Sequence, residues 1–167
     1  PAAVRMQLVG EGVNRTPTVE ALEALPAHSN YYLGNDPQRW QTEVPHFAKV
    51  RYSQVYPGVD WVLYGNPRQL EYDFVVAPGV DPAQIAVRFA GADALRVEAN
   101  GELVVSVAGR TVLHYSPTIY QNVNGEKREV SGRYVLRESA DAAPVVGFEI
   151  ASYDPKLPLV IDPIIYF

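Results

Sequence analysis

The 167-residue sequence predicts an all-β, mostly antiparallel sandwich of about ten to twelve short strands with one or two short helical turns. Its composition is the first reason: 14 Pro and 12 Gly break the chain often, and 11 Tyr suit half-buried strands. The second reason is spacing, because strand-like runs recur at about 8–12 residues from residue 44 onward. Since no linker-like tract divides the sequence, we expect residues 1–167 to form a single sandwich domain.

The first forty residues contain one clear strand and one clear turn. Residues 4–9 alternate apolar and polar side chains, which is the pattern of a strand with one wet face. Residues 10–30 are less regular, and we expect one helical turn or a packed loop there. Asn35 or Asp36 is expected to cap a short turn that begins at Pro37, and Trp40 is then expected to pack at the edge of the core.

The middle of the chain shows the strongest strand pattern. Residues 47–52 and 59–64 flank a turn at Pro57-Gly58, and residues 69–76 alternate so that their even-numbered side chains share an apolar face. After Pro78-Gly79, residues 81–84 resemble a second capped turn.

Two Asn-Gly pairs, Asn100-Gly101 and Asn124-Gly125, predict tight hairpins, because both central residues of such turns need positive φ. The chain then ends on an apolar run. Residues 158–163 are expected to close the sandwich, with Asp162 as a hydrogen-bonding residue at a turn or strand end. Residues 164–167 are expected to lead into a further domain.

The charge and composition exclude several classes of protein. A net charge of −5 with scattered basic residues argues against nucleic-acid binding, which needs a concentrated basic face. No apolar run approaches the roughly 18 residues of a membrane span. The absence of cysteine excludes disulfides and thiolate metal sites but leaves the compartment open.

No residue pattern states a reaction, and we predict no enzyme, catalytic residue, cofactor or metal. The histidines (His28, His46 and His114) lack the paired spacing of metal sites. Several carboxylates can hold a hard cation, and two can catalyse glycoside hydrolysis. The alternative is the polar face of an ordinary strand, which fits Glu71 and Asp73 best. The acidic residues considered are Asp60, Glu71, Asp73, Asp154 and Asp162.

The first half of the chain is rich in aromatic residues. Exposed Trp and Tyr rings hold sugars by stacking on their apolar ring faces. The candidate ligand-binding residues are Trp40, Trp61, Tyr56 and Tyr64. The alternative is that Trp61 belongs to the core between the sheets.

Four motifs in order resemble one known family: NYYLGND (residues 30–36), YPGVD (56–60), LEYDF (70–74) and PLVIDP (158–163). The chain is similar, over nearly its whole length, to the uncharacterised bacterial domain that precedes SBBP-type (seven-bladed β-propeller) repeats in exported proteins. That family has no established activity, so the resemblance supplies no catalytic residue. Its members carry a further β-rich segment upstream and propeller repeats downstream, so we expect the chain to be part of a longer protein.

The resemblance implies a secreted or cell-surface location and a non-catalytic structural or adhesive role. The expected partners are propeller repeats of the same polypeptide, other copies of the chain, or cell-surface glycans. We expect assembly by strand addition at a free sheet edge. A carbohydrate-binding module using the Trp and Tyr set is the first alternative, and a glycosidase-like enzyme with paired carboxylates is the second.

Overall fold

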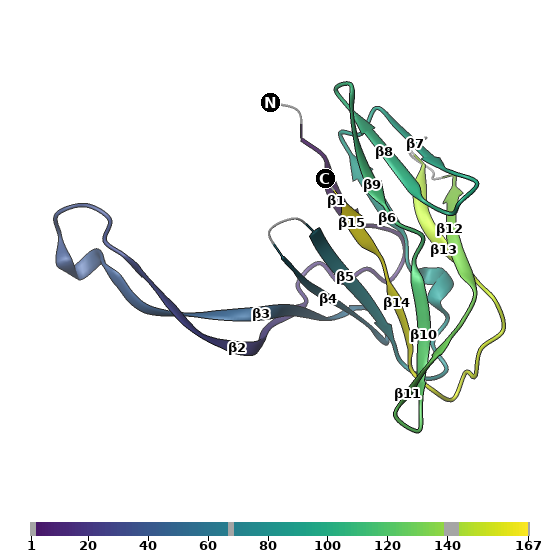
Figure 1. Cartoon of the computed structure of the whole chain (residues 1–167), viewed down its shortest axis with the longest axis horizontal. Helices are drawn as coiled ribbons and strands as arrows, with labels where there is room; N and C mark the ends of the chain where they lie inside the picture. Colours follow the sequence, from purple (N-terminus) through teal and green to yellow (C-terminus); the bar gives the residue numbers. More distant parts are fainter. Residues whose placement is uncertain (1–2, 67–68, 139–143, 167) are drawn as a thin grey trace.

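The computed structural model describes residues 3–66, 69–138 and 144–166, which form fifteen strands and two short 3-10 turns. Every strand pairing among them is antiparallel, and two sheets face each other (Figure 1). This confirms the predicted all-β sandwich. None of the described segments forms a helix that could cross a bilayer.

The smaller sheet has four strands in the order β1-β6-β13-β12. Their bounds are β1 (Arg5–Leu8), β6 (Val87–Ala90), β13 (Val145–Ile150) and β12 (Gly132–Arg137).

The larger sheet has eleven strands and divides in two beside β5. One edge of β5 pairs with β4. Its other edge pairs with β14 at Phe74–Val76 and with β15 at Gln69–Glu71. From there β14 continues the sheet to β10 and β11, whereas β15 continues it to β9, β8 and β7. The strands are β2 (Thr18–Tyr31), β3 (Gln41–Tyr56), β4 (Val59–Asn66), β5 (Gln69–Val76), β7 (Ala94–Val97), β8 (Leu103–Val107), β9 (Arg110–His114), β10 (Thr118–Val123), β11 (Glu126–Glu129), β14 (Leu159–Asp162) and β15 (Ile164–Tyr166).

The core lies between the two sheets. The predicted alternation of β5 is confirmed, because Tyr72, Phe74 and Val76 are buried whereas Glu71, Asp73 and Val75 are only partly covered. Rings from both sheets meet there, with the centroids of Phe74 and Phe148 5.8 Å apart. The sandwich is therefore held by an aromatic and aliphatic core that includes most of the buried residues.

The apolar end of the chain has a different structure from the one expected. Residues 159–162 are a sheet strand, as predicted. Ile164–Tyr166 is a strand as well, paired with β5 on one side and β9 on the other. Residues 164–166 are therefore part of the sandwich as well, since Ile165 is buried in the core, and the expectation that the segment leads into a further domain stays a prediction. Phe167 lies outside the described residues.

A long hairpin leaves the sandwich (Figure 1). It consists of β2 and β3, and β3 pairs with β4 only from Lys49 onward. Residues 23–48 therefore form a two-stranded ribbon, which we call the arm. Eight strand residues, 41–48, correspond to a reach of about 26 Å at about 3.3 Å per residue. The expected helical turn or packed loop at residues 10–30 is wrong, because most of this segment is β2.

Most of the predicted turns are confirmed, and one has a different structure. Asp36 and Asp81 cap 3-10 turns at Pro37–Arg39 and Pro82–Gln84, as predicted. Asn124 and Gly125 both have positive φ and join β10 to β11, as predicted. Asn100 differs: only its partner Gly101 has positive φ, and the pair lies in a longer loop between β7 and β8.

Candidate functional site: the hairpin arm and its root

The tip of the arm has a defined structure built by local contacts. The carboxylate of Asp36 accepts a hydrogen bond from the Gln38 amide at 3.0 Å. The indole Nε1 of Trp40 donates to the carbonyl of Gly34 at 3.1 Å, which closes the loop from its other side. The ring of Tyr32 meets the Trp40 ring edge-on with centroids 5.2 Å apart. The tip is therefore an ordered aromatic cluster.

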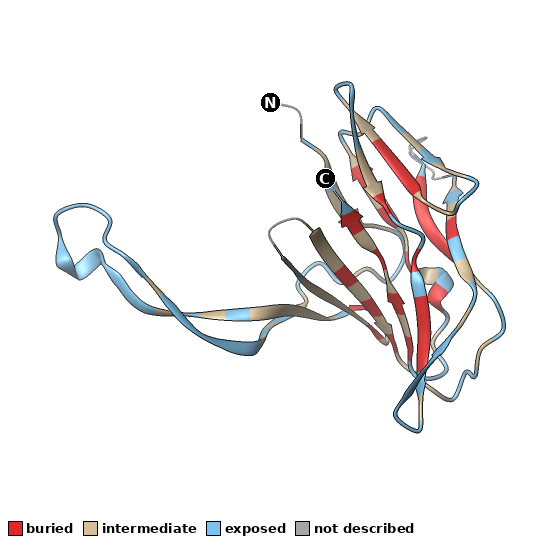
Figure 2. Ribbon diagram, in the orientation of Figure 1, coloured by how far each residue is buried: buried red, intermediate tan, exposed pale blue. Residues whose placement is uncertain are grey.

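That cluster is exposed (Figure 2). Leu33 is 69% exposed, Tyr32 60% and Trp40 38%, so the expectation that Trp40 packs at the core edge is wrong. No residue from 24 to 47 is buried. The large apolar side chains exposed on the arm are Leu25, Tyr31, Tyr32, Leu33, Trp40 and Phe47.

Cross-strand polar contacts hold the stem of the arm together. Ser29 Oγ lies 2.6 Å from His46 Nε2, and the Glu43 amide donates to Asn30 Oδ1 at 2.8 Å. Glu23 and Glu43 both have φ of +57°, a left-handed conformation that few non-glycine residues adopt. Such backbone is retained only where its surroundings enforce it, so the stem has a set shape.

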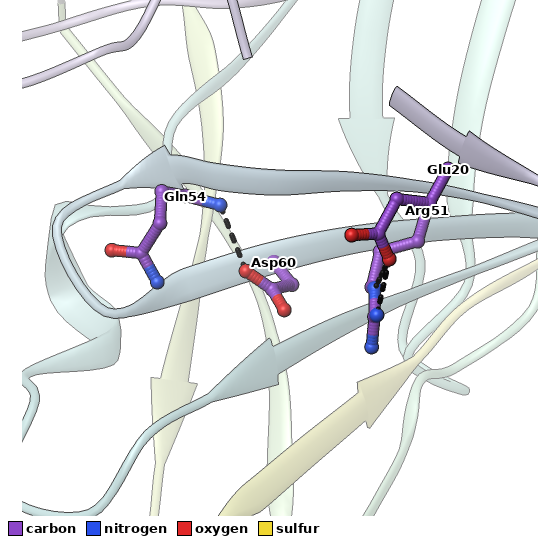
Figure 3. A network of polar contacts seen from close by, with 4 residues as sticks. All are labelled: Glu20, Arg51, Gln54 and Asp60. Carbon is purple, nitrogen blue, oxygen red and sulfur yellow. Dashed lines mark hydrogen bonds and ion pairs between the residues drawn. The ribbon is translucent and has the colours of Figure 1, made fainter. Parts of the chain in front are cut away.

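Polar contacts tie β3 to both of its neighbouring strands near the root of the arm (Figure 3). Glu20 of β2 and Arg51 of β3 form an ion pair across the hairpin. Gln54, with φ of +54°, donates its backbone amide to Asp60 Oδ1 at 2.8 Å, and its side-chain oxygen accepts from the Gly58 amide at 3.0 Å. The ion pair therefore joins the two strands that continue into the arm, and the Gln54 contacts hold the turn between β3 and β4.

The acidic residues considered for calcium or catalysis do not gather into one site. Asp60 is used at the root, and Asp154 caps its own turn by accepting from the Lys156 amide at 2.9 Å. Across the described part of the chain, no three His, Cys, Asp or Glu side chains are placed to share a metal ion.

Asp73 and Asp162 form a close pair. Asp162 follows Ile161 on β14, which is paired with Phe74, so Asp162 lies beside Asp73 on the outer face of the large sheet. The two carboxyl groups are close enough to act on each other's pKa, and the Tyr64 hydroxyl donates to Asp73 Oδ1 at 3.0 Å.

Burial and mutual repulsion set the protonation of this pair. Desolvation, followed by the nearby Asp162 charge, raises the pKa of Asp73 to about 6. Desolvation also raises the pKa of Asp162, partly offset by Lys127. Two touching carboxyl groups share a proton most favourably, and the pair therefore links β5 to β14 most strongly in acid.

A family model described as a domain of unknown function (DUF7948) matches residues 2–164. The chain belongs to this family. No curated protein and no solved structure matches it significantly.

In this DUF7948 domain, the four candidate ligand-binding residues do not share one surface. Trp40 is at the tip of the arm, and Trp61 is partly buried on β4, stacked on Phe74 with centroids 6.1 Å apart. Tyr56 is fully buried, and its hydroxyl donates to the carbonyl of Val9 at 2.7 Å. Tyr64 is partly buried and engaged with Asp73.

The histidines also differ in their surroundings. His114 is buried in the core of the DUF7948 domain, its Nδ1 3.2 Å from the Tyr72 hydroxyl and its ring 5.1 Å from the Phe89 ring. Desolvation lowers its pKa to about 4, so the ring is neutral near pH 7. His46 lies on the arm, where its Nε2 contacts Ser29 Oγ.

Sequence reasoning assigned no role to Leu33 and did not place the Tyr31–Leu33 run at the end of a projecting ribbon. Three large apolar residues directly precede a Gly-Asn-Asp-Pro turn without any alternation. A short continuous apolar run is more typical of a buried strand, so its exposure could be seen only in the folded chain.

Proposed function

We propose that this DUF7948 domain is a non-catalytic structural or adhesive module of an exported protein, and that its arm packs against β-propeller repeats of the same polypeptide. One observation carries the proposal: an ordered aromatic cluster stands exposed at the end of a ribbon that leaves the sandwich.

The physical argument begins with the instability of the arm. An isolated two-stranded hairpin is only marginally stable in water. Residues 23–48 pair only with each other and bury no side chain in the core. A partner that covers the six exposed apolar side chains of the arm would stabilise the hairpin, and the arm would in turn fix the partner.

The composition of the tip suits a protein partner. Trp, Tyr and Arg dominate binding energy at protein interfaces, and the tip holds Tyr31, Tyr32, Arg39 and Trp40. Residues 24–47 contain only three fully charged side chains, Asp36, Arg39 and Glu43, which favours a largely apolar contact.

The choice of partner rests on the resemblance to the domain that precedes propeller repeats, and so does the proposed secreted or cell-surface location. Strand addition is a further route to assembly. The free edge of β2 is interrupted by Pro26 and by the left-handed Glu23, both of which hinder pairing. Strand addition is therefore best accommodated at residues 18–22, and a stable monomer in light scattering at high concentration would argue against it.

Binding of the chain to its own propeller repeats, prepared separately, tests the proposal. Isothermal titration is expected to show binding that falls at least about tenfold when Tyr32, Leu33 and Trp40 are all replaced by Ser, because these side chains form the proposed contact. Leu136→Ser is the matched control, since Leu136 is an exposed leucine on β12 of the sandwich. Equal binding by the triple variant and the wild type would refute the role of the arm.

A further inference from the structure

An open pocket of about 440 Å³ lies at the root of the arm. It is bounded by the end of β1, by the loop from β1 to β2, and by side chains of β3, β4 and β6. A volume of this size is within the range of small-molecule sites. The pocket is separate from the exposed cluster at the tip of the arm.

One wall of the pocket is aromatic and rigid. Tyr52 and Trp61 both line it, with ring centroids 5.9 Å apart and planes inclined by 41°. The Trp61 ring is supported from behind by Phe74, which is nearly parallel to it at 8°. The Trp61 Nε1 is buried and has no hydrogen-bond partner among the described residues, an arrangement that native proteins rarely leave without a purpose.

The rest of the pocket is cationic and amide-rich. Its charged side chains are Arg15 and Arg88, and none of the described residues that line it carries a carboxylate, although the chain as a whole carries a net charge of −5. Glu138 lines the neighbouring pocket, which shares Arg15 and Arg88. Arg15 is exposed and makes no hydrogen bond or ion pair within the described part of the chain. Gln7 and Asn14 add amide groups to the lining.

We propose that this pocket binds a uronic acid residue of an acidic polysaccharide. The guanidinium group of Arg15 matches a carboxylate, because it offers paired N–H donors in one plane, and Arg88 adds a second positive charge to the lining. The aromatic wall matches the apolar face of a sugar ring, and the amides of Gln7 and Asn14 match its hydroxyl groups. This site is independent of the proposed docking role of the arm.

The two tryptophans permit a direct test. In Trp40→Phe the remaining indole is Trp61, so its emission reports on the pocket alone. Titration with trigalacturonate is expected to change this emission saturably, and the binding should weaken at high salt because the contact is ionic. Galactotriose, its neutral counterpart, is expected to bind at least about tenfold more weakly.

Arg15→Ala in the same background is expected to lower the affinity for trigalacturonate about tenfold, the usual effect of losing a charge-assisted hydrogen bond. Arg110→Ala is the control, because Arg110 is also exposed but lies at the start of β9 and is not among the residues that line the pocket. Circular dichroism verifies that both variants are folded.

Three results would overturn the proposal. The first is the absence of saturable binding by both fluorescence and calorimetry. The second is equal affinity for the acidic and the neutral trisaccharide, or for Arg15→Ala and Arg110→Ala. The third is preferential binding of a short apolar peptide through its C-terminal carboxylate, which would assign the pocket to peptides.

Discussion

At the residue scale, the most unusual local arrangement is the contact between the carboxyl groups of Asp73 and Asp162. The pKa of Asp73 is raised to about 6, above the ordinary value of 3.8 that applies in the unfolded chain. The folded state therefore holds a proton between about pH 4 and 6 that the unfolded state releases. The contribution of this pair to the free energy of unfolding is therefore largest in acid, and it is lost as the pH rises through about 6.

We predict that the free energy of unfolding of Asp73→Asn, relative to that of the wild type, is larger at pH 7.5 than at pH 4. The wild type loses its stabilising proton over this range, whereas the amide stays neutral at both values. The gain should be about 1–2 kcal/mol, after a reduction for partial exposure to solvent. Urea unfolding at the two pH values measures it. Glu71→Gln, on the same face of the same strand, is the control, and a difference that does not change with pH would contradict the prediction.

The contribution of His114 to stability depends on pH in the opposite direction. Its pKa is lowered to about 4 in the folded state, so the unfolded chain binds a proton between about pH 6.5 and 4 that the folded chain does not. The contribution of the neutral ring to the free energy of unfolding is therefore largest above pH 6.5, and it decreases as the pH falls. We predict a histidine ring resonance in NMR spectra that titrates near pH 4 and disappears in His114→Phe. A His114 resonance that titrates near pH 6.5 would contradict this account.

At the element scale, the short strand β15 is an integral part of the large sheet, because it pairs with β5 on one side and with β9 on the other. Its Ile165 is 5% exposed and packs in the core. We predict that Ile165→Ala lowers the free energy of unfolding by about 2–4 kcal/mol, as expected for a buried aliphatic residue. The exposed Leu136→Ala should change it by less than about 0.5 kcal/mol. Chemical unfolding of both variants is the measurement, and a similarly small effect of Ile165→Ala would mean that β15 does not belong to the core.

The arm has the opposite character, because it contributes nothing to the core. We predict that replacing residues 24–47 with Asn-Gly, a tight hairpin turn, leaves the sandwich folded. The free energy of unfolding should stay within about 1 kcal/mol of the wild type, since no residue of the removed segment is buried. Loss of the cooperative transition in circular dichroism would show that the arm is part of the folding unit.

The sequence predicts those elements whose pattern is local. The alternation in β5, the caps at Asp36 and Asp81, and the Asn124-Gly125 hairpin are all confirmed, since each depends on a few neighbouring residues. β2 could not be predicted, because a ribbon exposed on both faces does not alternate and Pro26 interrupts it. The turn at Ala108-Gly109 was missed as well, since alanine rarely adopts the positive φ found there.

The candidate site was less predictable than the fold. Nothing local distinguishes Trp40, which is exposed on the arm, from Trp61, which is held between strands. The pocket at the root of the arm joins Arg15, Arg88 and Trp61 from three separate segments, so only the folded chain brings them together. Asp73 and Asp162 likewise meet through the register of β5 and β14.

At the scale of the whole molecule, the sandwich contains the buried core, whereas the arm is exposed along its length. The two sheets hold the core, and Glu20, Arg51 and Asp60 tie β3 to the strands on either side of it. The arm carries most of the exposed large apolar side chains away from the sandwich. In the proposed function, the sandwich holds the arm in place and the arm contacts a neighbouring domain.

Hydrogen exchange of the arm tests this claim most directly. Backbone amides of residues 24–47 are compared in the isolated chain and in the chain joined to the propeller repeats of the proposed function. Exchange is predicted to be fast in the isolated chain, where the hairpin opens readily, and at least about tenfold slower in the joined protein, while core strands such as β5 stay unchanged. Equal exchange of the arm in both proteins would contradict the account.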